Sequence, residues 1–146
     1  MKMKNHLIIS LLILSVGFSQ RLSEVIETYD SGNIKSIKYH KKTRDRIEKV
    51  KFEKYYENGQ KEEEGTYFKG EDKMYEIGKK ILKVGLWTYW YENGQKWYER
   101  TYKDGEEDGL WTKWYKNGQM EREETYKDGN IVSYKRWNED GSVNND

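Results

Sequence analysis

The chain has 146 residues with 27 basic and 26 acidic side chains, which gives a formal net charge of +1 at pH 7. The two signs are interleaved, which argues against the one-sided basic surface of a nucleic-acid-binding protein. Cysteine and proline are absent, so disulfides are excluded and Gly, Asn and Asp must form the turns. Leu, Ile and Val are scarce beyond the first 20 residues, but 13 Tyr and 6 Trp supply rings that favour strands and bury large areas.

The N-terminal segment differs from the rest of the chain. Two lysines precede an apolar run over residues 7–16, and small residues at 17 and 19 have the spacing that signal peptidase reads before Gln20. The run is shorter than the about 20 apolar residues that a membrane-spanning helix needs. We therefore expect residues 1–19 to be a cleaved signal peptide, with an uncleaved anchor as the alternative. The mature chain would be exported to the periplasm, the cell surface or the medium, without a transmembrane segment.

Turn signals divide the remaining chain at regular intervals. Asn-Gly pairs stand at 58–59, 93–94 and 117–118, and weaker forms stand at Ser31-Gly32 and Asp140-Gly141. Asn-Gly is the strongest short-range hairpin signal, because both residues tolerate the positive φ of a type I′ turn. A second signal stands at Asp104-Gly105 and Asp128-Gly129, with Lys69-Gly70 in its place earlier. Two turns per 24 residues predict an all-β fold, an antiparallel meander of repeated β-hairpins in one extended domain.

This domain is expected to cover residues 20–146. Its clear copies span about 50–70, 85–105 and 109–129, and the copies at either end are degenerate. Between the first two clear copies, residues 71–84 form an insertion. We interpret it as a longer hairpin or loop, with a short helix as the alternative.

If each Asn-Gly pair closes a two-residue turn, the pairing of the flanking strands follows by counting. Trp87 then faces Arg100, Tyr89 faces Tyr98 and Trp90 faces Trp97. Because side chains alternate across a sheet, one face of this copy holds Trp87, Tyr89, Tyr91, Tyr98 and Tyr102, and the other holds Leu86, Thr88, Trp90 and Trp97. In the next copy Trp111 lies on the first face and Trp114 on the second.

The two faces differ in how constant they are. The first face is apolar in every clear copy, whereas the second turns polar in the copy at 50–70, where Tyr55 stands among Lys51, Glu53, Glu62 and Glu64. We therefore expect structural roles for Trp87, Trp111 and the turn glycines Gly59, Gly94 and Gly118. The candidate partner-binding residues are Tyr55, Trp90, Trp97 and Trp114. A second buried core beneath these rings is the alternative.

These residues resemble the MORN-repeat proteins in their bacterial variant form. The pattern matches Gly85, Trp87, Trp90, Tyr91, Asn93, Gly94, Tyr102 and Gly105, and it recurs at Gly109, Trp111, Trp114, Tyr115, Asn117, Gly118, Tyr126 and Gly129. A further copy, at residues 52–70, lacks the leading Gly and Trp. Proteins of this kind include YwqK-type antitoxins of toxin–antitoxin systems, and other MORN repeats are interaction or membrane-associating modules. The resemblance thus implies a non-catalytic binder.

Motifs for catalysis and for cofactor or metal binding are missing. Beyond the signal segment the one histidine is His40, on which every partner of a nucleophilic triad would have to converge. The carboxylates lie in runs typical of a solvated surface, and the glycines stand at turns instead of before a helix. Asp104–Gly109 has the acidic alternation of a calcium loop, but Tyr115 stands where the bidentate Glu belongs. We expect no catalytic residue, cofactor or metal ion.

Two classes of partner remain open. An antitoxin- or immunity-like protein interaction is preferred, and a module that binds a glycan or another envelope component through its exposed rings is the alternative. Nucleic acid is disfavoured by the Glu residues among the aromatics and by the charge of the mature chain, which keeps 25 basic and 26 acidic residues after loss of two lysines.

Overall fold

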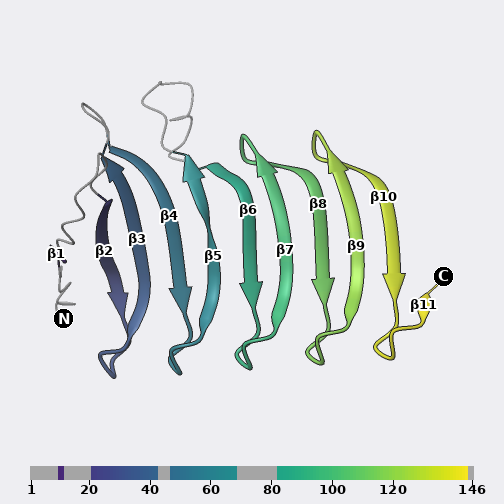
Figure 1. Ribbon diagram of the computed structural model, residues 1–146, viewed down its shortest axis with the longest axis horizontal. Helices are drawn as coiled ribbons and strands as arrows, with labels where there is room; N and C mark the ends of the chain where they lie inside the picture. The colour runs from purple at the N-terminus through teal and green to yellow at the C-terminus, as the bar shows by residue number, and fades with distance from the viewer. Residues whose placement is uncertain (1–9, 12–20, 43–46, 69–81, 145–146) are drawn as a thin grey trace, which may run out of the picture.

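The computed structural model describes residues 10–11, 21–42, 47–68 and 82–144. They form one antiparallel sheet whose strands follow each other in chain order (Figure 1). The strands are β1 (Ser10–Leu11), β2 (Arg21–Thr28), β3 (Ile34–Lys42), β4 (Ile47–Tyr55), β5 (Lys61–Phe68), β6 (Leu82–Trp90), β7 (Lys96–Lys103), β8 (Glu106–Trp114), β9 (Met120–Lys127), β10 (Asn130–Trp137) and β11 (Val143–Asn144). The predicted all-β meander is confirmed.

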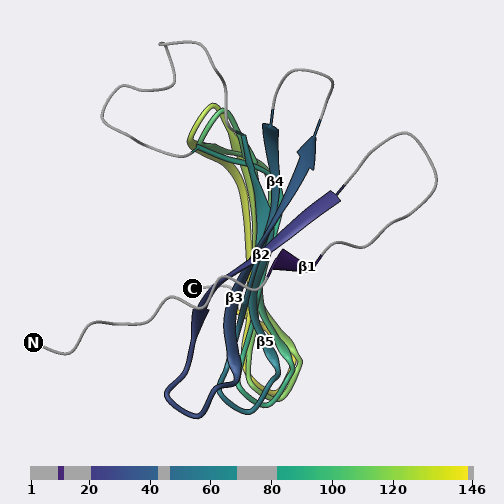
Figure 2. The ribbon, with the colours of Figure 1, turned by 90° about the vertical axis from the view of Figure 1, so that its left-hand side faces the viewer.

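The sheet is a single curved layer, as the view along it shows (Figure 2). Neither face is covered by another element of the described chain, so each face is stabilised by contacts between side chains on neighbouring strands. Strand β1 lies within the segment predicted to be a signal peptide, and most of the predicted insertion at 71–84 lies outside the described residues. No helix able to cross a bilayer is found in the described part of the chain.

The five turns at one end of the sheet share a geometry that differs from the predicted one. At Asn93-Gly94, the N–H of Gly94 donates to the Tyr91 carbonyl at 2.9 Å, and the N–H of Tyr91 donates to the Gln95 carbonyl at 2.8 Å. Only the glycine has a positive φ, of 84°. The prediction of a two-residue type I′ turn is therefore wrong: the loop has three residues, a type I turn followed by a glycine bulge.

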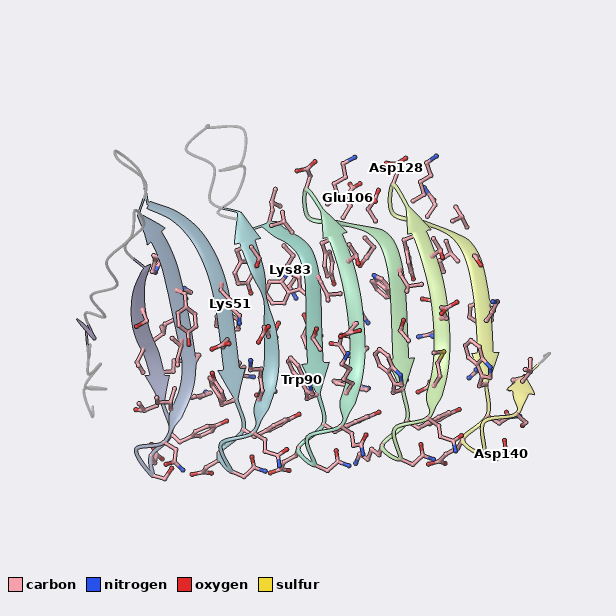
Figure 3. The ribbon with its side chains drawn as sticks, in the orientation of Figure 1. Lys51, Lys83, Trp90, Glu106, Asp128 and Asp140 are labelled. Carbon is pink, nitrogen blue, oxygen red and sulfur yellow. The ribbon has the colours of Figure 1, made fainter. Side chains whose placement is uncertain are left out.

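The type I′ turn occurs at the opposite end of the sheet. Asp104 and Gly105 have φ values of 51° and 89°, and Asp128 and Gly129 have values of 48° and 75°. The flanking residues of each Asp-Gly pair are partners in the sheet: Lys103 pairs with Glu106, and Lys127 pairs with Asn130. The Asp-Gly pairs thus form the two-residue turns, and the two kinds of turn alternate along the chain (Figure 3).

The three-residue turn shifts the pairing beside it by one residue, and a second bulge further along the strand restores the predicted register. The predicted pairs Trp87–Arg100 and Tyr89–Tyr98 are confirmed, but Trp90 pairs with Lys96 and leaves Trp97 as the extra residue. Glu62 and Glu121 are the extra residues of the equivalent hairpins.

The first face, which carries Trp87, Tyr89 and Tyr98, contains the core. Trp87 is fully buried, at 0 % exposure. Its indole lies on Gly65, where an added Cβ atom would meet ring atom Cδ2 at 2.1 Å. The ring of Tyr67 packs edge-on at 4.6 Å between centroids, and the indole N–H donates to the Thr66 carbonyl at 3.1 Å. Glycine at 65 therefore allows the largest side chain to lie on the neighbouring strand.

A ladder of side-chain hydrogen bonds joins each hairpin to the next at the three-residue turns. Asn58 Nδ2 donates to the Glu92 carbonyl at 3.2 Å, and Asn93 Nδ2 donates to the Lys116 carbonyl at 3.2 Å. Asn117 continues the ladder to the Glu139 carbonyl at 3.0 Å. Every acceptor is a main-chain oxygen, so the ladder places few demands on the sequence of the next hairpin.

Candidate functional site: an aromatic row on the second face

Four aromatic side chains occupy the same position in successive hairpins. They are Tyr55, Trp90, Trp114 and Trp137, the last residues of β4, β6, β8 and β10. Each stands four residues before the glycine of its turn, and each is half-buried. We call this set the aromatic row. Its members are separated by one intervening strand, so they repeat about every 10 Å across the sheet. Figure 3 shows Trp90 close to the turn end of β6.

Tyrosines from the preceding hairpins fix the backbone of the row. The hydroxyl of Tyr56 donates to the Trp90 carbonyl at 2.8 Å, and that of Tyr91 donates to the Trp114 carbonyl at 3.0 Å. Equivalent bonds at either end run from Tyr29 to Tyr55 (2.8 Å) and from Tyr115 to Trp137 (3.0 Å). One bond of the same kind at each step gives the row a regular spacing.

Lysines lie between the first three rings of the row, and Met120, which pairs with Trp114, lies between the third ring and the fourth. Lys61 pairs with Tyr55 across strands, and its ammonium lies 5.6 Å from the ring centroid of Trp90. Lys96 pairs with Trp90, and its ammonium lies 5.5 Å from the ring centroid of Trp114. These distances are within the range of cation–π attraction. The lysines therefore hold the indole faces at a defined orientation.

Carboxylates in the next line of the second face neutralise these lysines. Lys61 bonds to Glu53 at 3.1 Å and also contacts Glu64, and Lys96 bonds to Glu99 at 2.6 Å. Thr88 and Thr112 alternate with the acids across the sheet. The aromatic row thus lies in a charge-balanced surface.

Glu53 is the buried member of the carboxylate line, with a side chain 8 % exposed. Burial alone would raise its pKa, but hydrogen bonds from Tyr55, Lys51, Tyr39 and Lys61 outweigh this effect and lower the pKa to about 2. The hydroxyls of Tyr39 and Tyr55 both donate to Oε2 at 2.7 Å. Glu53 therefore stays ionised, and its contact with Tyr55 fixes the first ring of the row.

The comparisons with known proteins identify the repeat. Residues 50–69, 83–104 and 107–128 match the MORN repeat variant. Each of these three segments is similar to a MORN repeat, and we number them first to third in chain order. They contain Tyr55, Trp90 and Trp114, so the aromatic row is carried by successive MORN repeats and continues at Trp137 beyond the third matched segment. No curated protein and no solved structure matches the chain.

Of the predicted partner-binding residues, Trp97 lies apart from the others. As the extra residue of the second MORN repeat it packs on Tyr91 and Tyr98, at 5.6 and 4.6 Å between ring centroids. Its expected place opposite Trp90 on the second face is therefore wrong. Glu62 was expected there too, but it bonds to Lys54 at 2.7 Å, which the register places on the first face with Glu63 and Tyr89. The bulge explains both differences.

Trp137 belongs to the row but is missing from the residues predicted as candidates. Counting back four positions from Gly141 finds it, just as the same count from Gly94 finds Trp90. The degenerate sequence around it hides the match, because Asn138 replaces the usual tyrosine.

The first face differs from the row in how its rings are covered. Trp111 is half-buried, and the guanidinium of Arg100 lies 3.7 Å from its ring centroid. Tyr126 packs on the same ring at 4.4 Å. Trp111 Nε1 and Arg100 Nε are both buried without a hydrogen-bond partner. At the position equivalent to Trp87, the third repeat therefore has a less buried ring whose indole N–H lacks the hydrogen bond that Trp87 makes.

No group of three or more His, Cys, Asp or Glu side chains is placed to hold a metal ion within the described ranges. The acidic stretch Asp104–Gly109 forms the turn between β7 and β8 and the first residues of β8. His40 lies within β3, where it is half-buried and pairs with Leu22 and Lys49. Neither stretch provides a set of convergent catalytic groups.

Proposed function

We propose that the chain is a non-enzymatic, repeat-based binding module that holds a protein partner on its aromatic row. One observation carries this proposal: successive hairpins present a large ring at the same position of a face that no other described element covers. Aromatic side chains of this kind dominate binding energy at interfaces. The match to the MORN repeat variant suggests a repeat-based binding module, which agrees with this role.

The partner is an antitoxin- or immunity-type target in this proposal, and binding takes place after export. The resemblance to YwqK-type antitoxins motivates the first part, and the signal-like N-terminal segment motivates the second. An immunity-type protein that works outside the cytoplasm reconciles the two. The product of a neighbouring gene is the first partner to test, because toxins and their antidotes are encoded together.

Site-specific photo-crosslinking in producing cells tests the site. A photoreactive phenylalanine analogue placed at Trp114 should yield a discrete protein adduct, because the ring lies on the aromatic row. The same analogue at Trp97, an exposed ring on the opposite face, is the matched control and should yield none. Equal adducts from both positions, or none from Trp114, would contradict the proposed site.

Paired substitutions separate binding from folding. Trp90→Ala with Trp114→Ala should abolish capture of the crosslinked partner while the melting temperature changes little. Trp87→Ala with Trp111→Ala should unfold the protein, because Trp87 is the buried core residue of the first face and Trp111 packs against Arg100 and Tyr126 on the same face. Similar losses of stability in both pairs would mean that the aromatic row is a second core, and the site would be withdrawn.

A glycan or envelope component is the second candidate. The observation in its favour is the regular line of half-buried indoles, because flat rings stack on sugars as they do on apolar side chains. Retention of the purified chain on an insoluble β-1,4-linked glycan, lost in the Trp90→Ala and Trp114→Ala variant, would support it. Equal retention of that variant would reject the row as a glycan site.

A further inference from the structure

The pitch of the aromatic row matches one kind of backbone. We infer that the row binds a proline-rich segment in the polyproline II conformation, laid across the strands with a proline on each ring. This inference rests on the proposed function and names the chemistry of the partner. Rings on alternate strands repeat every two inter-strand distances, about 9.4–9.8 Å. A polyproline II helix has three residues per turn and rises about 3.1 Å per residue, so equivalent side chains repeat every 9.3 Å or so.

Other regular backbones fit this spacing less well. In an extended strand the side chain three residues on lies about 10 Å away but points to the opposite side. On an α-helix the residue seven positions on lies on the same face at about 10.5 Å. That excess of about 1 Å at each step accumulates over the three intervals from Tyr55 to Trp137. Polyproline II alone combines the pitch with a constant side.

The charge of the surface favours an uncharged ligand. The two lysines between the rings, Lys61 and Lys96, are already bonded to Glu53, Glu64 and Glu99. A proline segment with neutral spacers requires none of these pairs to break, whereas an anionic polymer would compete with the glutamates. Proline rings also pack on aromatic faces, the mode by which aromatic-lined grooves recognise such segments.

Donors are available for the ligand backbone. Polyproline II has no internal hydrogen bonds, so its carbonyls need partners. Within residues 47–68 and 82–144, Trp87 is the tryptophan whose indole N–H donates to a protein acceptor. The half-buried indoles of Trp90, Trp114 and Trp137 can donate to a segment that crosses them.

Isothermal titration calorimetry with two uncharged peptides tests the pitch. The first has proline at every third position with alanine between, and is long enough to reach all four rings, about 10 residues or more. The second has the same composition, with prolines rearranged so that no two are three apart. We expect the first to bind with Kd on the order of micromolar, as suits a small interface, and the second at least about tenfold more weakly. Equal affinity would overturn the inference.

Protein variants locate the binding. Trp90→Ala with Trp114→Ala should weaken the first peptide at least about tenfold, and Trp97→Ala, which removes a ring of the other face, should leave Kd unchanged. If the paired variant loses its strand signal in circular dichroism, Trp137→Ala at the end of the row takes its place and should weaken binding measurably. Loss of binding in Trp97→Ala, or none in the row variants, would overturn the inference.

A third ligand separates this inference from the proposed function. Binding of a soluble β-1,4-linked oligosaccharide in place of the peptide would reject the polyproline assignment and favour the glycan candidate. Failure of both ligands, with a protein adduct still formed from position 114, would reject the inference alone. If no protein adduct formed from position 114 either, the proposed function would be rejected together with the inference.

Discussion

Replacement of Trp87 by alanine should remove most of the stability of the repeat sheet. The Trp87 side chain is fully buried, at 0 % solvent exposure. Burial of about 200 Å² of indole at about 25 cal/mol per Å² corresponds to roughly 5 kcal/mol as an upper bound. Loss of the hydrogen bond to the Thr66 carbonyl adds about 1 kcal/mol. We therefore expect a loss of about 3–5 kcal/mol, in the range of other large aromatic truncations.

Urea denaturation followed by circular dichroism gives this number directly. Trp111→Ala is the internal comparison, because that ring is half-buried and its indole N–H has no partner. Trp111→Ala should therefore cost clearly less than Trp87→Ala. Phenylalanine variants sharpen the contrast. Trp87→Phe loses a hydrogen bond and should destabilise, whereas Trp111→Phe removes an unpaired buried donor and should be close to neutral.

The contact with Gly65 provides a second, independent test. A methyl group at this position would lie 2.1 Å from the indole, so Gly65→Ala should displace Trp87 and destabilise by a comparable amount. In the Trp87→Ala background the space is open, and Gly65→Ala should then cost little. Additive effects of the two changes, or a cost of Trp87→Ala below about 1 kcal/mol, would refute the assignment of this ring as the core.

Three further predictions concern the turns, acid stability and export. Gly94→Val should lower the melting temperature, since a β-branched residue resists a φ of 84°. Gly59→Val should have a similar effect, because Gly59 has the same φ and the Gln60 Oε1 atom that a Cβ at Gly94 would meet ends an exposed, flexible side chain. Equal melting temperatures for wild type and Gly94→Val would contradict this. The folded-state pKa of Glu53, about 2, lies below the ordinary value of 4.5, so the stability from its ion pairs is present above pH 4.5 and is lost as pH falls toward 2. That loss is at most about 3 kcal/mol and is reduced by screening, since Lys51 is 41 % exposed; urea titrations should show it in wild type and not in Glu53→Gln. Finally, N-terminal sequencing of the processed protein should begin at Gln20 or a near neighbour, and intact chain starting at Met1 in the cytoplasm would count against export.

The fold is predictable from the sequence because its signals are local and repeated. Alternation of rings with polar residues sets the two faces, and a turn signal every 12 residues or so sets the strand lengths. The pairs beyond the bulge, from Tyr89–Tyr98 onward, follow correctly by counting. The placement of Trp87 on the first face, beside Tyr89, also agrees with the predicted alternation of side chains.

Near the turns the same counting fails, for a definite physical reason. Asn-Gly is compatible both with a two-residue type I′ turn and with a three-residue loop whose glycine forms a bulge. The second moves Lys96 opposite Trp90, and a further bulge then leaves Trp97 as an extra residue on the first face. The Asn-Gly pattern alone does not distinguish the two turns. In the structure the three-residue turn is accompanied by hydrogen bonds from Asn93 and Tyr91 to the next hairpin, which the local pattern does not encode. The candidate site is therefore predicted only in part.

The ladder at the turns has a consequence for how such a protein lengthens or shortens over evolution. Asn58 and Tyr56 donate to main-chain carbonyls of the following hairpin, which every amino acid provides. A duplicated 24-residue unit would therefore find its acceptors without compensating mutations, and a deleted one would leave its neighbours able to join. In the last hairpin Asn138 and Asp140 bond instead to Ser142 within the same turn. We therefore expect repeats inside the array to be gained or lost without compensating mutations. The number of rings in the aromatic row would then vary between related proteins.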